Sequence, residues 1–532
     1  MTNIDDLVAN LQIEKEMAAA GVPGLALAIV QGGEMACARG LGVTSVEDGR
    51  LPVTPQTLFR IGSITKALTT TAAMHLVEAG LLDLDRPVGD YIPWLTFNEP
   101  GAEQRITLRL LLSHSAGLPT SYIPLGWRGP EGLEAHIRQD LQRYRFVAPP
   151  GKLYAYSNPG IRLAGFILQV VSGRPYAELM QELVFDPLEM RRTTFDPLVA
   201  MTYPLAQSHD RNADGTLSVQ HCFAENTGGY PSGMVISTVV DLTHFAVMQM
   251  SEGAYRGRQV LSPGSVAEMQ TIQADMYTAL FGGYGLALAI DRYKGLRRVG
   301  HDGSISTFGS KLVMVPEAGT AIVLFFNRAP GFWAKAQAIV ERALDELLGL
   351  PAQAVPPEAV EPDRGVWPRY TGTYLGDWRG LAVVEPAGDR LTLTWNGEAI
   401  PLRALRPDLY TGEKADGEAV SVGFVPEDGK VVEYLEVNSS PCRRFLPDPA
   451  PVLKPETWPA YAGKYTGVEK VAVRVEGDRL YLYSEDVDKE MPLVPLSNTR
   501  FACSVGLIDF HLAGDGSVPA LCYGDVYTLE KA

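Results

Sequence analysis

The last third of the chain contains one sequence pattern twice, and this repeat restricts the folds that the chain can adopt. The first copy reads Trp367-Pro-Arg-Tyr-Thr-Gly-Thr-Tyr374 and Gly388-Asp-Arg-Leu-Thr-Leu-Thr394; the second reads Trp458-Pro-Ala-Tyr-Ala-Gly-Lys-Tyr465 and Gly477-Asp-Arg-Leu-Tyr-Leu-Tyr483. Alternating apolar and polar residues between turn residues indicate short antiparallel strands. Two copies are too few for a solenoid, which needs about three stacked repeats. The pattern therefore predicts two small antiparallel β-barrels.

Two proline-rich stretches, 350–362 and 446–455, separate the copies from each other and from the rest of the chain. Proline fixes φ and removes a backbone donor, so such stretches exclude helix and central strand and are typical of linkers. We therefore expect three domains, at residues 1–350, 363–446 and 456–532.

The first of these domains has strand patterns at both ends and helical patterns between them. Segments 24–30 and 34–43 flank a glycine pair and predict a hairpin, and segments 309–315 and 321–327 predict a second one. Apolar residues recur with helical spacing at 66–79, 160–171 and 239–250. This order predicts an α+β domain in which both ends of the segment contribute strands to one antiparallel sheet, flanked by helices.

The charge balance limits the classes of partner. The chain has 46 Lys and Arg against 62 Asp and Glu, a formal net charge of −16. Nucleic acids and anionic membrane surfaces both need clustered basic residues, so we expect neither as a partner. A small molecule or short peptide is the expected substrate, and a homodimer stays open beside a monomer.

The N-terminus and the apolar runs indicate where the chain resides. The first twenty residues have no basic segment followed by an apolar one, so they do not predict a signal peptide. The longest apolar runs, at 24–30 and 320–326, are far shorter than the roughly 20 residues that span a bilayer. We expect a cytoplasmic protein.

Ser63-Ile-Thr-Lys66 opens the first helical segment and supplies a candidate nucleophile. Three residues apart on a helix, the two side chains lie on one face, one turn apart. A buried lysine has a lowered pKa, so its neutral amine can accept the serine proton. Alone the motif is weak, because an N-cap serine beside a surface lysine gives the same pattern.

The second element is Tyr156-Ser-Asn158, in the Pro- and Gly-bounded loop 149–160. A tyrosine there can transfer a proton if a nearby cation lowers its pKa, and we expect Lys66 to be that cation. The Asn158 amide can hold both the lysine and a substrate carbonyl. An ordinary turn with an exposed aromatic is the alternative.

The third element is His301-Asp-Gly303, followed by Ser304. We expect Gly303 to let a substrate backbone approach the strand edge and pair with it. The backbone N–H groups of Ser304 and Ser63 are candidates for an oxyanion hole. A lone histidine is more often structural than catalytic.

Taken in order, the three elements resemble the penicillin-recognising serine hydrolases, which include class C β-lactamases, DD-peptidases, esterases and D-aminopeptidases. The resemblance spans about residues 15 to 345, and five further stretches support it: 110–118, 150–151, 228–229, 237–238 and 284–286. It implies a β-lactamase-like fold with a helical subdomain, Ser63 as the acylated nucleophile, and Lys66 and Tyr156 as the acid/base pair. His301 replaces the lysine of β-lactamases and is expected to protonate or orient the substrate.

Other hydrolase classes are not indicated. The chain has no G-x-S-x-G elbow, no H-E-x-x-H motif and no clustered cysteines, so we expect neither an α/β-hydrolase nor a metal or other cofactor.

The domain order is similar to that of bacterial D-aminopeptidases, in which a loop from the last barrel narrows the active site. Here the candidate loops are 485–490 and 498–501, where Glu485, Asp486 and Asp488 can offset an ammonium group unless they are only solvated strand ends. We therefore expect a hydrolase that removes N-terminal D-residues from short peptides, amides or esters. An esterase or acyltransferase is the main alternative, and a non-catalytic binding protein is the third.

Overall fold

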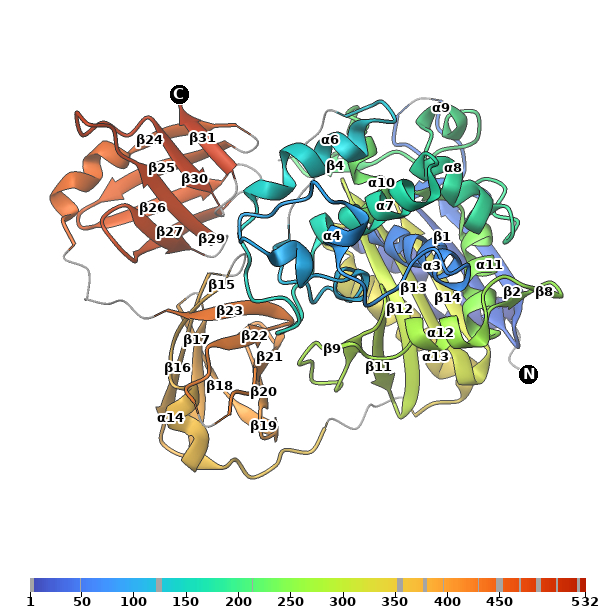
Figure 1. Cartoon of the computed structure of the whole chain (residues 1–532). Coiled ribbons are helices and arrows are strands. Elements are labelled where there is room, and N and C mark those ends of the chain that lie inside the picture. Colours follow the sequence, from blue (N-terminus) through green and yellow to red (C-terminus); the bar gives the residue numbers. More distant parts are fainter. Residues whose placement is uncertain are drawn as a thin grey trace.

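The computed structural model describes residues 4–47, 49–120, 127–212, 214–351, 357–376, 380–395, 397–428, 430–445, 453–467, 470–484, 489–503, 506–523 and 527–532. They form a large α+β domain followed by two β-domains, which lie beside it in Figure 1. No helix among these residues is long and apolar enough to cross a bilayer.

The large domain is built on an antiparallel sheet in the order β2-β1-β14-β13-β12-β11-β10-β9. Its strands are β1 Gly24–Gln31, β2 Glu34–Gly42, β9 Ala274–Asp275, β10 Gly283–Tyr284, β11 Ala289–Tyr293, β12 Leu296–Ile305, β13 Phe308–Val315 and β14 Thr320–Phe326. Strand β1 pairs with β14 from Leu25↔Phe326 to Val30↔Ala321. This pairing confirms that both ends of the domain contribute to one sheet.

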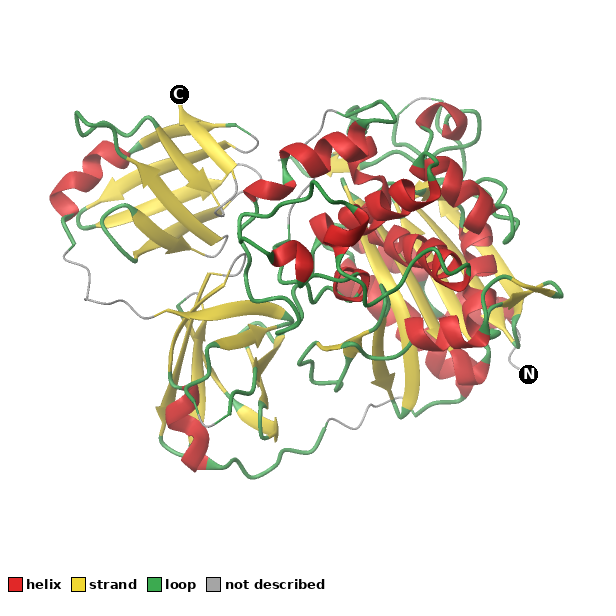
Figure 2. Ribbon diagram, in the orientation of Figure 1, coloured by secondary structure: helices red, strands yellow, loops and turns green. Residues whose placement is uncertain are grey.

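Helices cover both faces of this sheet, as Figure 2 shows. The helices are α1 Ile4–Asn10, α2 Ile13–Ala20, α3 Thr65–Glu78, α4 Val88–Tyr91, α5 Leu108–Leu112, α6 Gly132–Gln139, α7 Asn158–Ser172, α8 Tyr176–Met180, α9 Pro197–Ala200, α10 Tyr230–Gly233, α11 Val239–Met250, α12 Pro263–Met269 and α13 Trp333–Leu348. Short strand pairs join β3 Phe59–Arg60 to β6 Ile236–Ser237, β4 His209–Arg211 to β5 Leu217–Val219, and β7 Ala254–Tyr255 to β8 Arg258–Gln259. The three helical segments expected from apolar spacing correspond to α3, α7 and α11.

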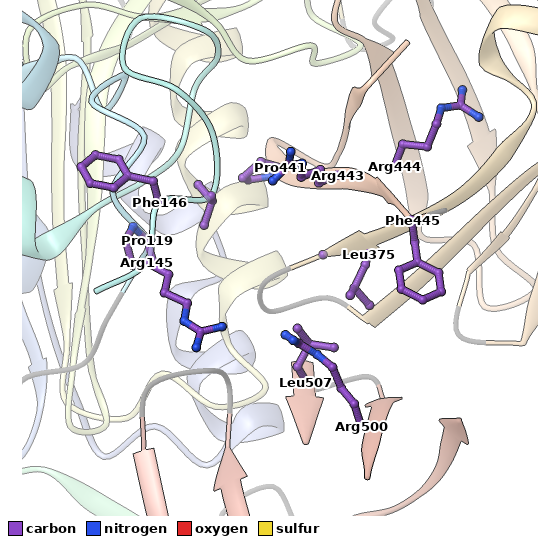
Figure 3. Close-up of a pocket in the computed structure, with 12 residues that line it drawn as sticks. Pro119, Arg145, Phe146, Leu375, Pro441, Arg443, Arg444, Phe445, Arg500 and Leu507 are labelled. Carbon is purple, nitrogen blue, oxygen red and sulfur yellow. The ribbon is translucent and has the colours of Figure 1, made fainter. Parts of the chain in front are cut away.

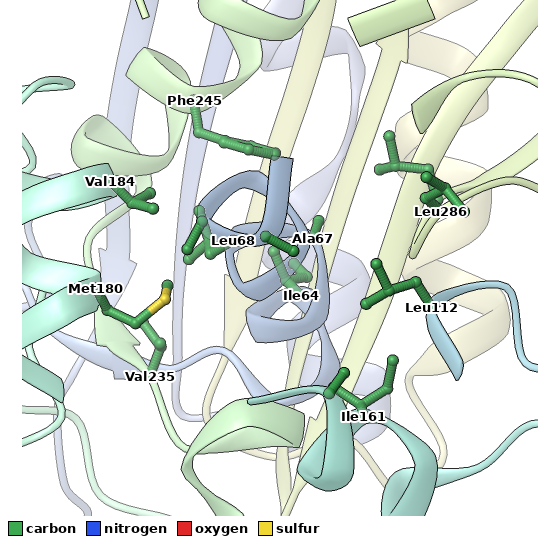
Figure 4. Packing of buried hydrophobic residues seen from close by; sticks show 14 of the residues in the cluster. Ile64, Ala67, Leu68, Leu112, Ile161, Met180, Val184, Val235, Phe245 and Leu286 are labelled. Carbon is green, nitrogen blue, oxygen red and sulfur yellow. The ribbon is translucent and has the colours of Figure 1, made fainter. Parts of the chain in front are cut away.

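Helix α3 lies at the centre of the larger hydrophobic core. Ile64, Ala67 and Leu68 are fully buried, and Figure 4 shows them surrounded by apolar side chains such as Phe245 and Leu112. Burial of this kind contributes about 25 cal/mol per Å² of apolar surface. The core therefore fixes the first turn of α3 and with it the positions of Ser63 and Lys66.

The two β-domains share one strand order, but one strand of the first domain is interrupted. The second is a closed barrel of β24 Gly463–Thr466, β25 Lys470–Glu476, β26 Arg479–Ser484, β27 Lys489–Pro495, β28 Arg500–Cys503, β29 Gly506–His511, β30 Ala520–Tyr523 and β31 Tyr527–Lys531. The first follows helix α14 Trp367–Tyr370 and comprises β15 Gly372–Gly376, β16 Gly380–Ala387, β17 Arg390–Trp395, β18 Glu398–Pro401, β19 Arg403–Arg406, β20 Leu409–Glu413, β21 Ala419–Phe424, β22 Tyr434–Val437 and β23 Ser440–Phe445.

Strands β18 and β19 together correspond to the single strand β27. Strand β18 pairs with β17 and β19 with β20, as the two halves of β27 pair with β26 and β28. The interruption at Leu402 leaves a nearly closed, barrel-like sheet of nine strands, in agreement with the small barrel that the repeat predicts. Pro401 is the last residue of β18, directly before Leu402, and it has no N–H to donate to a neighbouring strand.

Equivalent residues perform equivalent roles in both copies, which confirms the repeat. The hydroxyl of Tyr374 donates to the carbonyl of Tyr370 at 2.7 Å, and that of Tyr465 to the carbonyl of Tyr461 at 2.7 Å. Tyr370 stacks on Phe424 with ring centroids 4.0 Å apart.

The first β-domain docks on the large domain through an apolar cluster. It brings together Ala148, Leu153, Ala155 and Tyr277 with Leu405, Leu409, Val425 and Tyr434. Ser421 Oγ accepts a hydrogen bond from the Ala279 amide at 3.1 Å, and Ser439 Oγ donates to the Met276 carbonyl at 2.7 Å. Gly423 permits the closest approach, since a Cβ there would lie 2.0 Å from Cγ of Tyr277.

We predict that Gly423→Ala weakens this docking, because the added methyl group meets the Tyr277 ring and overpacking typically costs about 1–3 kcal/mol. The radius of gyration from small-angle X-ray scattering should rise. Gly514→Ala is the matched control, since a Cβ at Gly514 meets nothing within 4 Å. An unchanged radius for both variants would contradict the docking role of Gly423.

Candidate active site

Ser63 and Lys66 lie where a short 3-10 turn, Gly62–Ile64, leads into α3. Lys66 Nζ is 2.8 Å from Ser63 Oγ, and it donates to the Ser232 carbonyl at 2.6 Å. The lysine side chain is fully buried, and this desolvation lowers its pKa well below the ordinary value, with the charge of Arg162 adding to the effect. The neutral amine is therefore a base in contact with the serine hydroxyl.

Tyr156 lies beside this pair, but its pKa shifts in the direction opposite to the one expected. Its hydroxyl hydrogen-bonds Ser63, and Lys66 Nζ lies 4.9 Å from the centroid of its ring. Burial raises the pKa of Tyr156 well above its ordinary value. The expectation that Lys66 lowers this pKa was wrong, because the same burial removes the charge from the lysine. Tyr156 is a phenol that holds its proton and can donate it.

His301 is buried and engages both ring nitrogens. Nδ1 donates to the Asp302 carbonyl at 2.5 Å, which leaves Nε2 to accept from the Tyr284 hydroxyl at 2.8 Å. Burial lowers the pKa of His301 to about 4. A neutral imidazole with both nitrogens bonded orients its neighbours; this geometry does not support the expected alternative that it protonates the substrate.

Gly303 has a packing role that the sequence did not indicate. A Cβ there would lie 2.0 Å from the Ile61 carbonyl oxygen and 2.4 Å from Ser310 Oγ. Glycine is required here because β12 packs directly against the turn that precedes Ser63. That Gly303 also lets a substrate backbone approach stays a prediction.

The amide of Ser304 is held close to the nucleophile by the same packing. A Cβ on Gly62 would lie 2.6 Å from the Ser304 nitrogen. Strand β11 pairs with β12 only as far as Gly300, so residues 301–305 pair on one side only, with β13. Ser304 thus lies on the unpaired part of this edge, next to Ser63.

A cavity of about 580 Å³ opens in front of Ser63. It is lined by Ser63, Pro119, Thr120, Val147, Tyr154, Ala155, Tyr156, Asn158, Ser304, Asn438, Ser439, Ser440 and Pro441. Four of the expected site residues, Ser63, Tyr156, Asn158 and Ser304, share this wall; Lys66, His301 and Gly303 lie behind it. Asn158 is placed there as the first residue of α7, whose N-cap Ser157 accepts the Gly160 amide at 3.0 Å.

Among the described residues, the first β-domain lines this cavity and the last does not. The tight turn between β22 and β23 contributes residues 438–441, with φ of 48° at Asn438 and 60° at Ser439, as in a type I′ hairpin turn. We expected loops of the last barrel here, but none of residues 498–501 lines the cavity. Glu485, Asp486 and Asp488 lie outside the described residues.

His114 holds Tyr156 in place and was not identified from the sequence as a site residue. Its Nδ1 accepts the Ser157 amide at 3.1 Å, and its carbonyl accepts the Ala155 amide at 2.6 Å. Its ring centroid is 4.3 Å from that of Tyr156. The stretch 110–118 contributed to the family resemblance, but the contact with Tyr156 is made only in the fold.

Arg162 supports Lys66 through Ser232 and was also not identified from the sequence as a site residue. Its Nε donates to Ser232 Oγ at 3.3 Å, and its guanidinium lies 3.2 Å from His136 Nε2. Ser232 is the residue whose carbonyl binds Lys66. The available signal was an arginine within an otherwise apolar helical segment.

Among the described residues no group of His, Cys, Asp and Glu side chains is arranged to hold a metal ion.

The family of the chain follows from comparison with known proteins. The Beta-lactamase family matches residues 10–345, so the chain belongs to this family, as the motifs predicted. The chain is 29% identical to penicillin-binding protein 4 of Amycolatopsis lactamdurans over 324 residues, which cover 58% of this chain and 81% of that protein.

Two solved structures extend this comparison. One is the octameric penicillin-binding protein homologue from Pyrococcus abyssi, with a TM-score of 0.57 and 26% identity over 83% of this chain and 100% of that chain. The other is the D-amino acid amidase from Ochrobactrum anthropi SV3, with a TM-score of 0.53 and 26% identity over 65% of this chain and 99% of that chain.

We predict that Lys66→Met abolishes activity and raises the melting temperature at pH 7. The unfolded lysine stays charged up to pH about 10.4, whereas the buried amine is neutral, so folding releases a proton and is opposed at neutral pH. Methionine removes this cost, and the gain in melting temperature should shrink as the pH approaches 10.4. Lys470→Met, at an exposed position, should show no such pH dependence. A lower melting temperature of Lys66→Met at pH 7 would contradict a neutral buried amine.

Proposed function

We propose that the chain is a serine hydrolase that forms an acyl-enzyme on Ser63 and releases N-terminal D-residues from short peptides or amides. The contact of 2.8 Å between Lys66 Nζ and Ser63 Oγ carries this proposal, because a buried neutral amine beside a hydroxyl is the arrangement that activates a nucleophile.

In the acylation step, the Ser63 hydroxyl gives its proton to Lys66 Nζ while its oxygen attacks the substrate carbonyl. The backbone N–H groups of Ser63 and Ser304 stabilise the oxyanion, and losing one such donor typically costs about 2.7–4 kcal/mol. As the bond to the leaving amine breaks, Tyr156 donates its phenolic proton to that amine. The proton held by Lys66 then returns to the tyrosine, so the charge balance of the site is restored.

Deacylation uses the same groups in the reverse sense. A water molecule attacks the acyl carbonyl and gives a proton to Tyr156, which at the same time passes its own phenolic proton to Lys66 Nζ. Lys66 then returns this proton to the oxygen of Ser63 as the acyl bond breaks. His301 and Tyr284 take no proton in either step; their hydrogen bond at 2.8 Å fixes the wall behind Tyr156.

The substrate class rests on two observations. The similarity to a D-amino acid amidase supports a D-residue in the acyl position. The turn 438–441 restricts the cavity in front of Ser63 to about 580 Å³, which favours a short substrate. An esterase or acyltransferase uses the same acyl-enzyme and is the alternative that the substrate test decides. A cytoplasmic location stays a prediction.

The first test is release of p-nitroaniline from D-Ala and L-Ala p-nitroanilides. We predict turnover of the D-form alone, and its loss in Ser63→Ala with little change in thermal unfolding, because loss of a triad-type nucleophile costs up to about a million-fold. Ser251→Ala, at an exposed position, is the control and should keep full activity. Residual activity of Ser63→Ala above about one part in a thousand would contradict the assignment of the nucleophile. Turnover of neither anilide would favour the esterase or acyltransferase.

A further inference from the structure

A second cavity, of about 320 Å³, lies where all three domains meet (Figure 3). The large domain contributes Arg145, the first β-domain Arg443 and Arg444, and the second β-domain Arg500. Pro119, Val147 and Pro441 line both this cavity and the one in front of Ser63. The two cavities are therefore neighbours with common walls.

The lining of this second cavity, which we call the arginine pocket, is strongly basic. Among the described residues it contains four arginines and no aspartate or glutamate. Its other lining residues are apolar or glycine, including Phe146, Leu375 and Phe445. Such a concentration of positive charge is unexpected in a chain with a net charge of −16.

Two of these arginines have no carboxylate partner among the described residues. Arg444 donates to the carbonyls of Val432, Thr371 and Arg369 and to the Tyr374 hydroxyl, so no carboxylate neutralises it there. Arg145 makes no hydrogen bond or ion pair with a described residue.

The two remaining arginines have acidic partners outside the lining. Arg443 pairs with Glu433 at 2.8 Å, where both side chains are largely exposed, and Arg500 pairs with Asp509 at 3.4 Å. The exposed pair of Arg443 is weak, at about 0–1 kcal/mol, so Arg443 can turn to a ligand that enters the pocket. Arg500 keeps its acidic partner and adds its positive charge to the lining.

The arginine side chains differ in whether they point into the arginine pocket. In Figure 3 the side chains of Arg145 and Arg500 extend towards each other from the first and third domains, whereas that of Arg444 points away. Like charges that face each other across a domain junction repel. An anion between them would offset this repulsion.

We infer that the arginine pocket binds the C-terminal carboxylate of a short peptide substrate. This inference rests on the proposed function, in which the N-terminal residue of the peptide acylates Ser63 and the remaining peptide is the leaving group. The leaving group carries the free carboxylate, and arginine recognises a carboxylate through two parallel N–H···O bonds. In acyl transfer, the acceptor would place its carboxylate in the same pocket.

The spacing of the walls sets a minimum length for the substrate. Pro441 lines both cavities, and Arg443 lies two residues further along β23, about 7 Å away. An extended peptide advances about 3.3–3.6 Å per residue. A peptide that runs from the shared wall at Pro441 to Arg443 therefore extends over about two residues, and we expect a tripeptide or longer peptide to connect Ser63 with the arginine pocket.

The test compares D-Ala-Ala-Ala and D-Ala-Ala-Ala-Ala with the same peptides that carry a C-terminal amide. With the wild-type chain, kcat/KM should be about 10- to 100-fold higher for the free carboxylate, as expected for charged hydrogen bonds. Arg145→Gln with Arg500→Gln should remove this preference and leave D-Ala p-nitroanilide turnover unchanged. The control is Arg474→Gln, an exposed arginine of the same barrel that pairs with Glu490.

The outcomes separate this inference from the proposed function. Turnover of the anilide with equal kcat/KM for carboxylate and amide peptides would overturn the arginine pocket and leave the hydrolase standing. If no peptide is cleaved, calorimetry with Ser63→Ala measures binding of the same peptides directly. Tighter binding of the carboxylate form, lost in the double arginine variant, supports the pocket; equal binding overturns it.

Discussion

The burial of one amine, that of Lys66, is the constraint on which the site depends. Its removal from water keeps it neutral, and only a neutral amine can accept the proton of Ser63. The same enclosure keeps Tyr156 protonated and His301 uncharged. The ordinary pKa values of these three groups differ by several units, yet the core around α3 keeps all three uncharged. Ser63 therefore contacts one group that can accept a proton and one that can donate it.

This enclosure is assembled from segments that are distant in the sequence. Lys66 is held by Ser232 from α10, Ser232 by Arg162 from α7, and Tyr156 by His114 from the end of α5. A buried polar group is costly unless it is hydrogen-bonded, so each of these partners is needed to keep the next one in place. The first β-domain then closes the front of the site with its turn at 438–441.

The sequence predicted what local patterns determine. The hairpins, the helices α3, α7 and α11 and the repeat all follow from periodicity and turn residues, and their structures agree. The expectation for Tyr156 was wrong because a pKa depends on burial, which no motif of three residues contains. The packing role of Gly303 was missed for a related reason, since the atoms that exclude a side chain there, Ile61 O and Ser310 Oγ, come from other elements. Which β-domain reaches the cavity depends on the docking contact between Tyr277 and Gly423. The sequence could not predict this contact, because no local pattern links the two segments.

The duplicated β-domain has a consequence for how such a chain can diversify. Its first copy reaches the cavity through a two-residue turn whose backbone is set by hairpin geometry, not by the residues that follow it. The second copy is an uninterrupted barrel, whereas the first has the same order of strands with one of them interrupted. The topology therefore tolerates local changes. Substrate preference can therefore evolve at the tip of an accessory module, while the residues that activate the serine stay in a core that tolerates little change.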